Sequence, residues 1–236
     1  MTFVTFRDYL EGVPRSPTPY SVDAVVLAPL RGELAVLLQR GRARRRGPWA
    51  LPWGAPGARE RVGPAALRVA RAALGGAPAW IEQVGAFDEG ARHPSGAALS
   101  IAYIALTTER AALAVDEEGE VEWVPRRALP ALPGRQGVIL DAALAAVRAR
   151  VDRAPVAFRF LPEEFTLSAL QEMYELLLGR RLHKASFRRA LHAARLVEPT
   201  GEWRSEGRGR PAQLFRYAPR TRRGGQRGVR FDLLRE

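Results

Sequence analysis

The chain contains 236 residues, 47% of them hydrophobic, and its 37 basic and 25 acidic side chains give a formal net charge of +12. The absence of cysteine excludes disulfides, thiolate catalysis and cysteine-bound zinc, and three scattered histidines do not predict a metal site. The length leaves room for two ordinary domains. We find no signal-peptide pattern, and no apolar run approaches the ~20 residues that a membrane span needs. We therefore expect a cytoplasmic protein with no membrane partner.

The first half of the chain alternates strand-length apolar runs with segments of helical periodicity. Apolar runs at 22–28 and 34–39 flank a turn containing Pro and Gly and predict a β-hairpin, whereas 41–57 is rich in Arg, Trp, Pro and Gly and is expected to be a loop. Apolar residues recur every three or four positions from Pro64 to Leu74, which predicts a helix that Gly75 ends. The remaining predicted elements are strands at 80–87, 97–106 and 120–124 and a helix at 138–151. This mixture predicts an α/β fold, a sandwich of helices and a sheet.

Four residues in this half follow a fixed spacing, Gly54-x5-Glu60-x7-Arg68-x6-Gly75. The spacing resembles the Nudix box, a loop and helix whose glutamates hold divalent metals. The stretch at 48–54 is similar to the Trp-x-Leu-Pro-Gly-Gly segment before that box, and 121–125 resembles a late Nudix strand. The resemblance covers roughly residues 20–150 and implies an αβα Nudix-like sandwich.

The three positions of the box that should carry carboxylates are Val69, Ala72 and Ala73. Glutamates there would share a helix face and converge on one metal, but hydrocarbon side chains offer none of the oxygen ligands that Mg²⁺ requires. Glu60 is expected to pair with Arg68 and brace the loop against the helix. We therefore predict no catalytic residue, no metal and no cofactor, and a pocket that binds a nucleotide-like ligand without cleaving it.

An acidic cluster leaves an enzymatic alternative open. Residues 116–120 contain four carboxylates, including Glu117 and Glu118, and Glu122 follows closely. Nudix enzymes sometimes recruit a base from a loop in this half of the domain. The alternative is thus a Mg²⁺-dependent Nudix hydrolase, similar to an ADP-ribose pyrophosphatase, with relocated metal ligands.

The pattern of apolar and charged residues changes after 152–155. This change predicts two domains, at 1–153 and 154–236. The first has 20 basic and 16 acidic residues, net +4, and the second has 17 and 9, net +8. A helix is expected between a capping Thr166 and Gly179, and a second helix at 184–195. A Gly/Arg-rich loop at 207–211 and a strand at 212–217 complete the pattern of a winged helix-turn-helix.

The second predicted helix has a basic face that suits duplex DNA. Phe187 and Leu191 lie on its apolar face, and arginine on the other face could read guanine in the major groove while lysine and serine hold phosphates. The predicted DNA-binding residues are Lys184, Ser186, Arg188, Arg189 and His192 on the helix, with Arg208 and Arg210 on the wing. A basic helix packed on the first domain and an RNA-binding module remain alternatives.

Three stretches of the second half, 165–171, 184–189 and 209–212, resemble the DNA-binding module of Nudix-related transcriptional regulators of NAD metabolism. This resemblance implies a repressor of NAD or sugar metabolism genes that binds a palindromic operator as a homodimer. It also implies an effector, ADP-ribose or a related nucleotide or sugar phosphate, that weakens the hold on DNA. The ligand itself does not follow from the family.

Two stretches are similar to the segments that line the ligand pocket in that family, 81–87 to Gln-Leu-x-x-Phe and 92–94 to Arg-Asp-Pro. The resemblance implies that Arg40 and Arg92 neutralise phosphate, that Phe87 stacks on a base and that Gln83 bonds a ribose or base edge. His93 stands where aspartate is usual, which changes the polar contacts available to a ligand. The alternative for Phe87 is a place in the core, and for the arginines a place on the surface.

Overall fold

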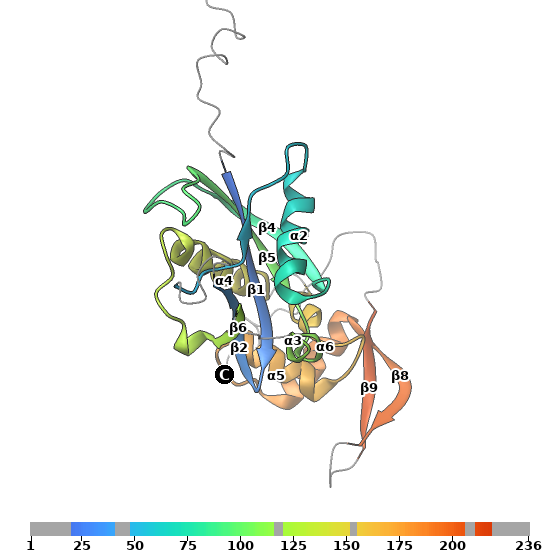
Figure 1. Cartoon of the computed structure of the whole chain (residues 1–236). Helices are drawn as coiled ribbons and strands as arrows, with labels where there is room; N and C mark the ends of the chain where they lie inside the picture. The colour runs from blue at the N-terminus through green and yellow to red at the C-terminus, as the bar shows by residue number, and fades with distance from the viewer. Residues whose placement is uncertain (1–19, 41–47, 116–119, 152–154, 206–210, 219–236) are drawn as a thin grey trace, which may run out of the picture.

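The computed structural model describes residues 20–40, 48–115, 120–151, 155–205 and 211–218 (Figure 1). A six-stranded sheet organises the first half, with the strand order β4-β5-β1-β2-β6 and β3 paired to β1. Its strands are β1 (Tyr20–Leu30), β2 (Glu33–Gln39), β3 (Trp53–Gly54), β4 (Trp80–Phe87), β5 (Leu99–Leu106) and β6 (Val121–Pro125). Only the β1–β5 pairing is parallel among the described strands.

The predicted hairpin and the three later strands are confirmed, with small shifts at their ends. The β1–β2 turn has left-handed backbone at Arg31 and Gly32, which is typical of tight hairpins. β3 was not expected, because 41–57 was predicted to be loop. It is only two residues long and exists because Val22 pairs with Gly54 and Asp23 with Trp53.

Helices cover both faces of the sheet (Figure 1). α2 (Val62–Leu74) packs on one face, ends at Gly75 in the left-handed conformation, and confirms the predicted helix. α4 (Gln136–Val151) packs on the other face and begins two residues before its predicted start. Two short helical elements of this half were also not predicted, α3 (Glu109–Leu113) and the 3-10 helix η1 (Arg126–Ala128). No described helix is long and apolar enough to cross a membrane.

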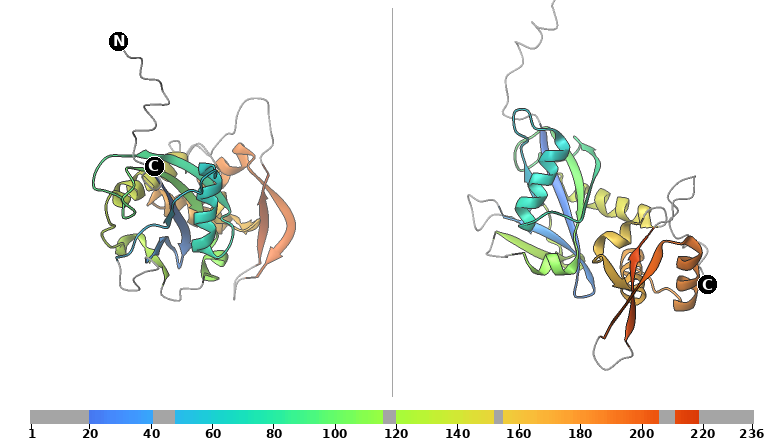
Figure 2. Two further views of the ribbon diagram at one scale, coloured as in Figure 1. Left: turned by 45° about the horizontal axis from the view of Figure 1, so that its top comes forward. Right: turned by 90° about the vertical axis from the view of Figure 1, so that its right-hand side faces the viewer.

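The second half is a winged helix, shown beside the sheet domain in the two views of Figure 2. Its elements are the 3-10 helix η2 (Val156–Phe160), β7 (Glu164–Thr166), α5 (Leu167–Leu178), α6 (Lys184–Ala194), β8 (Val197–Arg204) and β9 (Ala212–Tyr217). The hydroxyl of Thr166 accepts a bond from the Ala169 amide at 3.1 Å, and Gly179 ends α5 in the left-handed conformation. Both predicted helices are confirmed, and β7-β9-β8 forms the small sheet of the wing.

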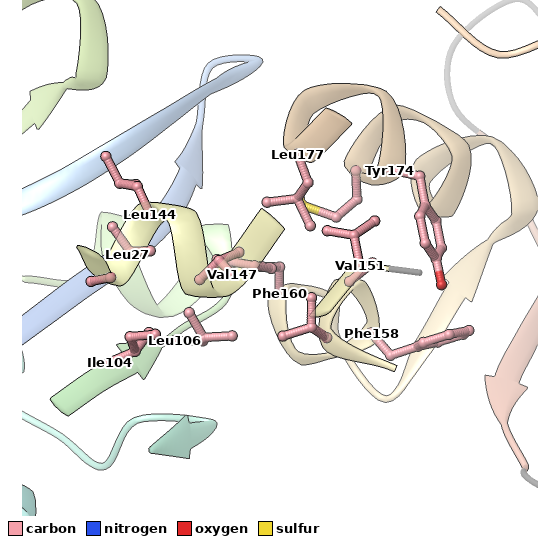
Figure 3. Close-up of a cluster of buried hydrophobic side chains, with 14 of the residues drawn as sticks. Leu27, Ile104, Leu106, Leu144, Val147, Val151, Phe158, Phe160, Tyr174 and Leu177 are labelled. Carbon is pink, nitrogen blue, oxygen red and sulfur yellow. The ribbon is translucent and has the colours of Figure 1, made fainter. Parts of the chain in front are cut away.

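One hydrophobic cluster runs from the large sheet through α4 into the winged helix (Figure 3). Val147 and Val151 on α4 belong to the same buried cluster as Phe160 on η2 and Leu177 on α5. The predicted domain boundary falls at 152–155, of which 152–154 lie outside the described residues. The C-terminal half of α4 is therefore the packing partner of the second domain as well as a cover of the sheet.

Candidate functional site

The loop and helix of the Nudix-like box are braced by one ion pair. Arg68 donates from Nε to Glu60 Oε1 at 2.9 Å and from Nη2 to Glu60 Oε2 at 2.6 Å, and Nη2 also reaches the Ala55 carbonyl at 2.9 Å. Glu60 Oε2 accepts the Gly57 amide at 2.9 Å. The Arg68 bonds, with help from Gly57, lower the pKa of Glu60 to about 2. Both carboxylate oxygens are thus engaged in holding the loop, the scaffold role expected from the sequence.

Hydrocarbon fills the face of α2 where the box would carry its metal ligands. Val69 is only 5% exposed and Ala73 6%, and both belong to the buried cluster where α2 packs on β1. A Cβ added to Gly54 would lie 3.0 Å from a methyl of Val69, so the backbone fits closely over this side chain. Ala72, on the same side of the helix, is exposed. Positions 72 and 73 are about 100° apart around a helix, and the edge of the buried face passes between them.

Among the described residues, no group of three or more His, Asp or Glu side chains is placed to hold a metal ion. The acidic stretch with Glu117 and Glu118 falls at 116–119, outside the described residues.

The predicted ligand residues on β4 lie on opposite faces of the sheet. A register shift between Gln83 and Gly85 interrupts the alternation of the strand. Gln83 pairs with Tyr103, on the side of α2, and accepts a bond from the Tyr103 hydroxyl at 3.2 Å. Phe87 packs, half-buried, against the cluster on the side of α4. The two side chains therefore do not line one surface.

The two predicted phosphate ligands are also separated in the fold. Arg40 follows β2, with β1 and β5 between it and β4, and its guanidinium lies 4.2 Å over the ring of Trp49. Arg92 is exposed in the loop that joins β4 to β5. Phe87 ends β4, and Arg92 follows five residues later in the loop after it. A role for the four in ligand binding stays a prediction.

Hollows lie at the opposite end of the sheet, around the β1–β2 turn. One of about 460 Å³ is bordered by α3 and β6. A larger one of about 980 Å³ lies between the turn and the winged helix, with Glu109 of α3 on one side and Met173 of α5 on the other. Neither is lined by a predicted ligand residue.

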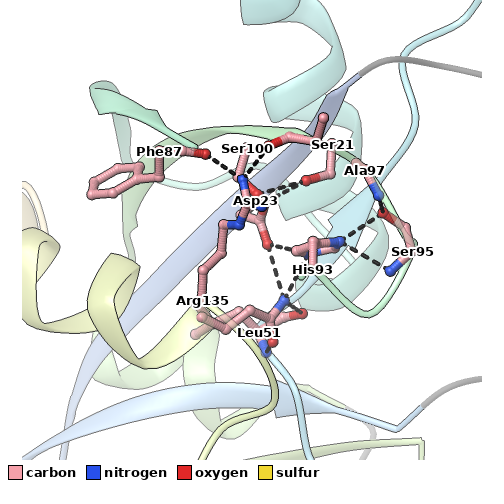
Figure 4. Close-up of polar contacts among 11 residues, drawn as sticks. Ser21, Asp23, Leu51, Phe87, His93, Ser95, Ala97, Ser100 and Arg135 are labelled. Carbon is pink, nitrogen blue, oxygen red and sulfur yellow. Dashed lines mark hydrogen bonds and ion pairs between the residues drawn. The ribbon is translucent and has the colours of Figure 1, made fainter. Parts of the chain in front are cut away.

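A buried polar cluster connects the β4–β5 loop to the sheet and to α4 (Figure 4). Asp23, His93 and Gln136 are all buried. Asp23 Oδ1 lies 2.9 Å from His93 Nε2 and accepts from Gln136 Nε2 at 2.9 Å, while Asp23 Oδ2 accepts the Ser21 hydroxyl at 2.9 Å. His93 Nδ1 accepts the Ser95 amide at 3.1 Å, which leaves Nε2 to carry the proton and donate to Asp23.

This cluster was not predicted from the sequence, although the sequence contains one signal of it. Asp23 is the only charged residue in the apolar run 22–28, where a buried carboxylate requires a partner. The partner is His93, the residue that departs from the Arg-Asp-Pro pattern. Its side chain points inward to Asp23 and not to a ligand.

In the winged helix, α6 presents a cationic face to solvent. Phe187 and Leu191 are fully buried, and the Phe187 ring meets Tyr174 of α5 at a centroid distance of 5.6 Å. The outward side chains are those predicted, with Lys184, Arg188, Arg189 and His192 exposed and Ser186 half-buried.

The hydroxyl of Ser186 is held at the start of α6. It lies 3.1 Å from Nδ1 of His183, the residue that precedes the helix, and accepts from Arg189 at 3.4 Å. The wing beyond it is the β8–β9 hairpin, in which Trp203 is 59% exposed beside the exposed Arg204. Arg208 and Arg210 lie at 206–210, outside the described residues.

Comparison with known proteins gives consistent relatives for both halves. Residues 157–217 match the family model described as the NrtR DNA-binding winged helix domain. The chain is 31% identical over 209 residues to the ADPR responsive transcriptional repressor NtrR of Acinetobacter baylyi, covering 86% of this chain and 83% of the relative. It is also similar to two solved structures of NrtR from Shewanella oneidensis.

The first is the complex of that protein with a 27mer DNA, which is 29% identical, has a TM-score of 0.73 and covers 86% of this chain and 94% of the other. The second, NrtR alone, is 28% identical with a TM-score of 0.75 and covers 90% and 99%. Both halves of the fold, the Nudix-like domain and the winged helix, therefore occur together in these relatives.

Proposed function

The chain belongs to the NrtR family of transcriptional repressors, and we propose that it is a DNA-binding repressor of NAD or sugar metabolism genes controlled by a nucleotide or sugar-phosphate effector. The observation that carries this proposal is the cationic face of α6, held outward by the buried Phe187 and Leu191. The A. baylyi relative is described as ADPR responsive, so ADP-ribose is the effector we propose first.

The face of α6 has the chemistry and the size of a major-groove reader. The helix has 11 residues, about 16 Å at 1.5 Å per residue, and the major groove is about 12 Å wide. Arg188 and Arg189 are proposed to contact bases, and Lys184 and Ser186 the phosphates beside the helix N-terminus. The S. oneidensis relative was solved with a 27mer DNA, which supports duplex DNA as the partner.

We propose that the protein binds a palindromic operator as a homodimer, because the two halves of a palindrome present the same surface twice. A single α6 reads one half-site, and two helices a turn of DNA apart need two copies of the chain. We propose that the wing, with Arg208 and Arg210, adds contacts to the adjacent backbone or minor groove.

The first domain is proposed to sense its ligand and not to hydrolyse it. Val69 and Ala73 replace the oxygen ligands of the box with buried hydrocarbon, and Glu60 has both oxygens engaged with Arg68 and Gly57. Divalent metals that activate phosphate esters need carboxylates at such positions. The exposed Arg92 is proposed to meet the effector phosphate, with Phe87, Gln83 and Arg40 as further candidate contacts.

The DNA-binding proposal is tested with the double variant Arg188→Ala and Arg189→Ala. Each base-reading arginine is worth about 1–3 kcal/mol, so the affinity for a selected duplex should fall by at least about tenfold, and discrimination against mismatched duplex should relax. Arg71→Ala with Arg61→Ala, two exposed arginines near α2, is the matched control for charge. Equal affinities of the α6 variant and the parent at the same salt would show that α6 is not the reading helix.

The sensing proposal is tested by chromatography of ADP-ribose incubated with the protein and Mg²⁺. We expect no release of AMP above the rate without protein. AMP release that is abolished by Glu60→Gln, or by neutralising Glu117 and Glu118, would instead identify a hydrolase with relocated metal ligands.

A further inference from the structure

The loop that carries Arg92 is fastened to the first residues of α4 (Figure 4). Arg135, directly before the helix, is buried and donates from Nη1 to the Phe87 carbonyl at 2.6 Å and to the Ala98 carbonyl at 2.6 Å. Phe87 ends β4, and Ala98 lies just before β5. One guanidinium group therefore joins both ends of the loop.

A second set of bonds fixes the middle of the same loop. Gln136, the first residue of α4, donates to Asp23 at 2.9 Å, and Asp23 holds His93, the neighbour of Arg92. Gln136 Oε1 also accepts the Leu51 amide at 2.9 Å, which ties the helix to the segment before the box. A Cβ on Gly134 would lie 2.1 Å from the Arg92 carbonyl, so the backbones of the two segments are in direct contact.

The other end of α4 is packed into the winged helix (Figure 3). Val147 and Val151 are buried in the cluster that contains Phe160 and Leu177. Arg150, in the last turn, forms an ion pair with Glu82 of β4. The 16 residues of α4 span about 24 Å, so one rigid element has the Arg92 loop at one end and the DNA-binding domain at the other.

We propose that Arg135 and Gln136 are positioning residues through which α4 transmits occupancy of the effector site to the winged helix. The inference rests on the proposed function, because it takes the Arg92 loop as part of the effector site. Two sets of hydrogen bonds connect the effector site to α4. Arg135 binds the two ends of the Arg92 loop, and the chain Gln136–Asp23–His93 binds its middle.

Transmission through α4 has a physical basis, because closely packed elements move as units. An effector shifts the DNA affinity only if it binds the two states of the protein differently. A displacement of the Arg92 loop that is bonded to the start of α4 shifts that end of the helix, and the close-packed contacts at Val147 and Val151 carry the shift to α5. When the bonds to the loop are removed, the loop can accommodate the effector without moving α4.

The test compares the full-length protein with Arg135→Met, Arg135→Lys and the control Arg71→Met, which removes an exposed arginine from α2. Fluorescence anisotropy of a labelled duplex, selected by the parent protein from a random library, gives Kd for DNA without effector and with saturating ADP-ribose. Calorimetry gives Kd for ADP-ribose. The ratio of the two DNA constants is the coupling, for which roughly 5- to 150-fold is usual.

Arg135→Met is expected to bind DNA alone within about twofold of the parent, while its coupling falls to within about twofold of one. Arg135→Lys, which keeps a donor at this place, should recover part of the coupling, and Arg71→Met should keep all of it. Should Arg135→Met fail to fold, Gln136→Met replaces it with the same expectation. Either folded variant keeping the parental coupling, or losing more than about tenfold in DNA affinity without effector, would overturn the assignment.

This experiment distinguishes a wrong effector from a wrong role for Arg135 and Gln136. If ADP-ribose leaves the DNA affinity of the parent unchanged, the proposed effector is wrong, and the inference falls with it. If the parent responds and the variants respond equally, only the positioning role of Arg135 and Gln136 is wrong.

Discussion

Two glycines three residues apart at the start of α4 should respond in opposite ways to the same substitution. Gly134 has φ of +58°, and an added Cβ would lie 2.1 Å from the Arg92 carbonyl oxygen. The left-handed backbone costs a side chain about 1–2 kcal/mol, and overpacking typically adds about 1–3 kcal/mol. Gly134→Ala should therefore lower the free energy of unfolding by about 2–5 kcal/mol. Gly137 has no atom within 4 Å of an added Cβ, and alanine is the better helix former by up to about 1 kcal/mol.

Scanning calorimetry of the full chain measures both effects. At about 2–4 °C per kcal/mol for a chain of this size, Gly134→Ala should lower Tm by at least about 4 °C, whereas Gly137→Ala should leave it unchanged or raise it by up to about 4 °C. Gly134→Ala should also weaken ADP-ribose binding, since the Arg92 loop must move to admit the methyl group. Equal Tm values for the two variants would refute the close contact between Gly134 and the loop.

Four further substitutions test the box and the winged helix. The pKa of Glu60 is about 2, below its usual 4.5. Its ion pair with Arg68 therefore contributes fully to stability above about pH 4.5, and this contribution is lost as the pH falls toward 2. Glu60→Gln should flatten the pH dependence of Tm in that window. Val69→Glu buries a carboxylate in an apolar cluster and should lower the free energy of unfolding, measured by urea denaturation, by several kcal/mol. Ala72→Glu, at an exposed position, should lower it little. Similar urea midpoints for the two variants would contradict the burial of Val69. Phe187→Ala should cost about 3–5 kcal/mol by the same measurement, and a loss below about 1 kcal/mol would show that the ring is not core.

The elements that could be predicted from the sequence are those with local signals. α5 has a capping Thr166, a stripe of apolar residues at helical spacing and a closing Gly179, and α2 ends at Gly75 in the same way. β3 and β7 have two and three residues, and each is defined by pairing with a distant strand. Such strands carry no signal in their own residues, because the hydrogen bonds that create them come from elsewhere in the chain.

The candidate site was less predictable for a related reason. Strict alternation along β4 would place Gln83 and Phe87 on one face, but the irregularity between Gln83 and Gly85 shifts the register and separates them. The Asp23–His93–Gln136 cluster joins residues 70 and 113 positions apart, so only the folded topology brings them together. The exposed residues of α6 were predictable because one helical period decides both its buried and its solvent faces.

One titration shows whether this chain is a repressor whose Nudix-like domain senses its ligand and does not hydrolyse it. The full-length protein is bound to a duplex selected by it from a random library, and ADP-ribose is added with Mg²⁺ while anisotropy reports DNA binding and chromatography reports AMP. We expect ADP-ribose to raise Kd for the duplex at least about fivefold while no AMP is released. Unchanged DNA affinity together with steady release of AMP would contradict it and identify an enzyme instead.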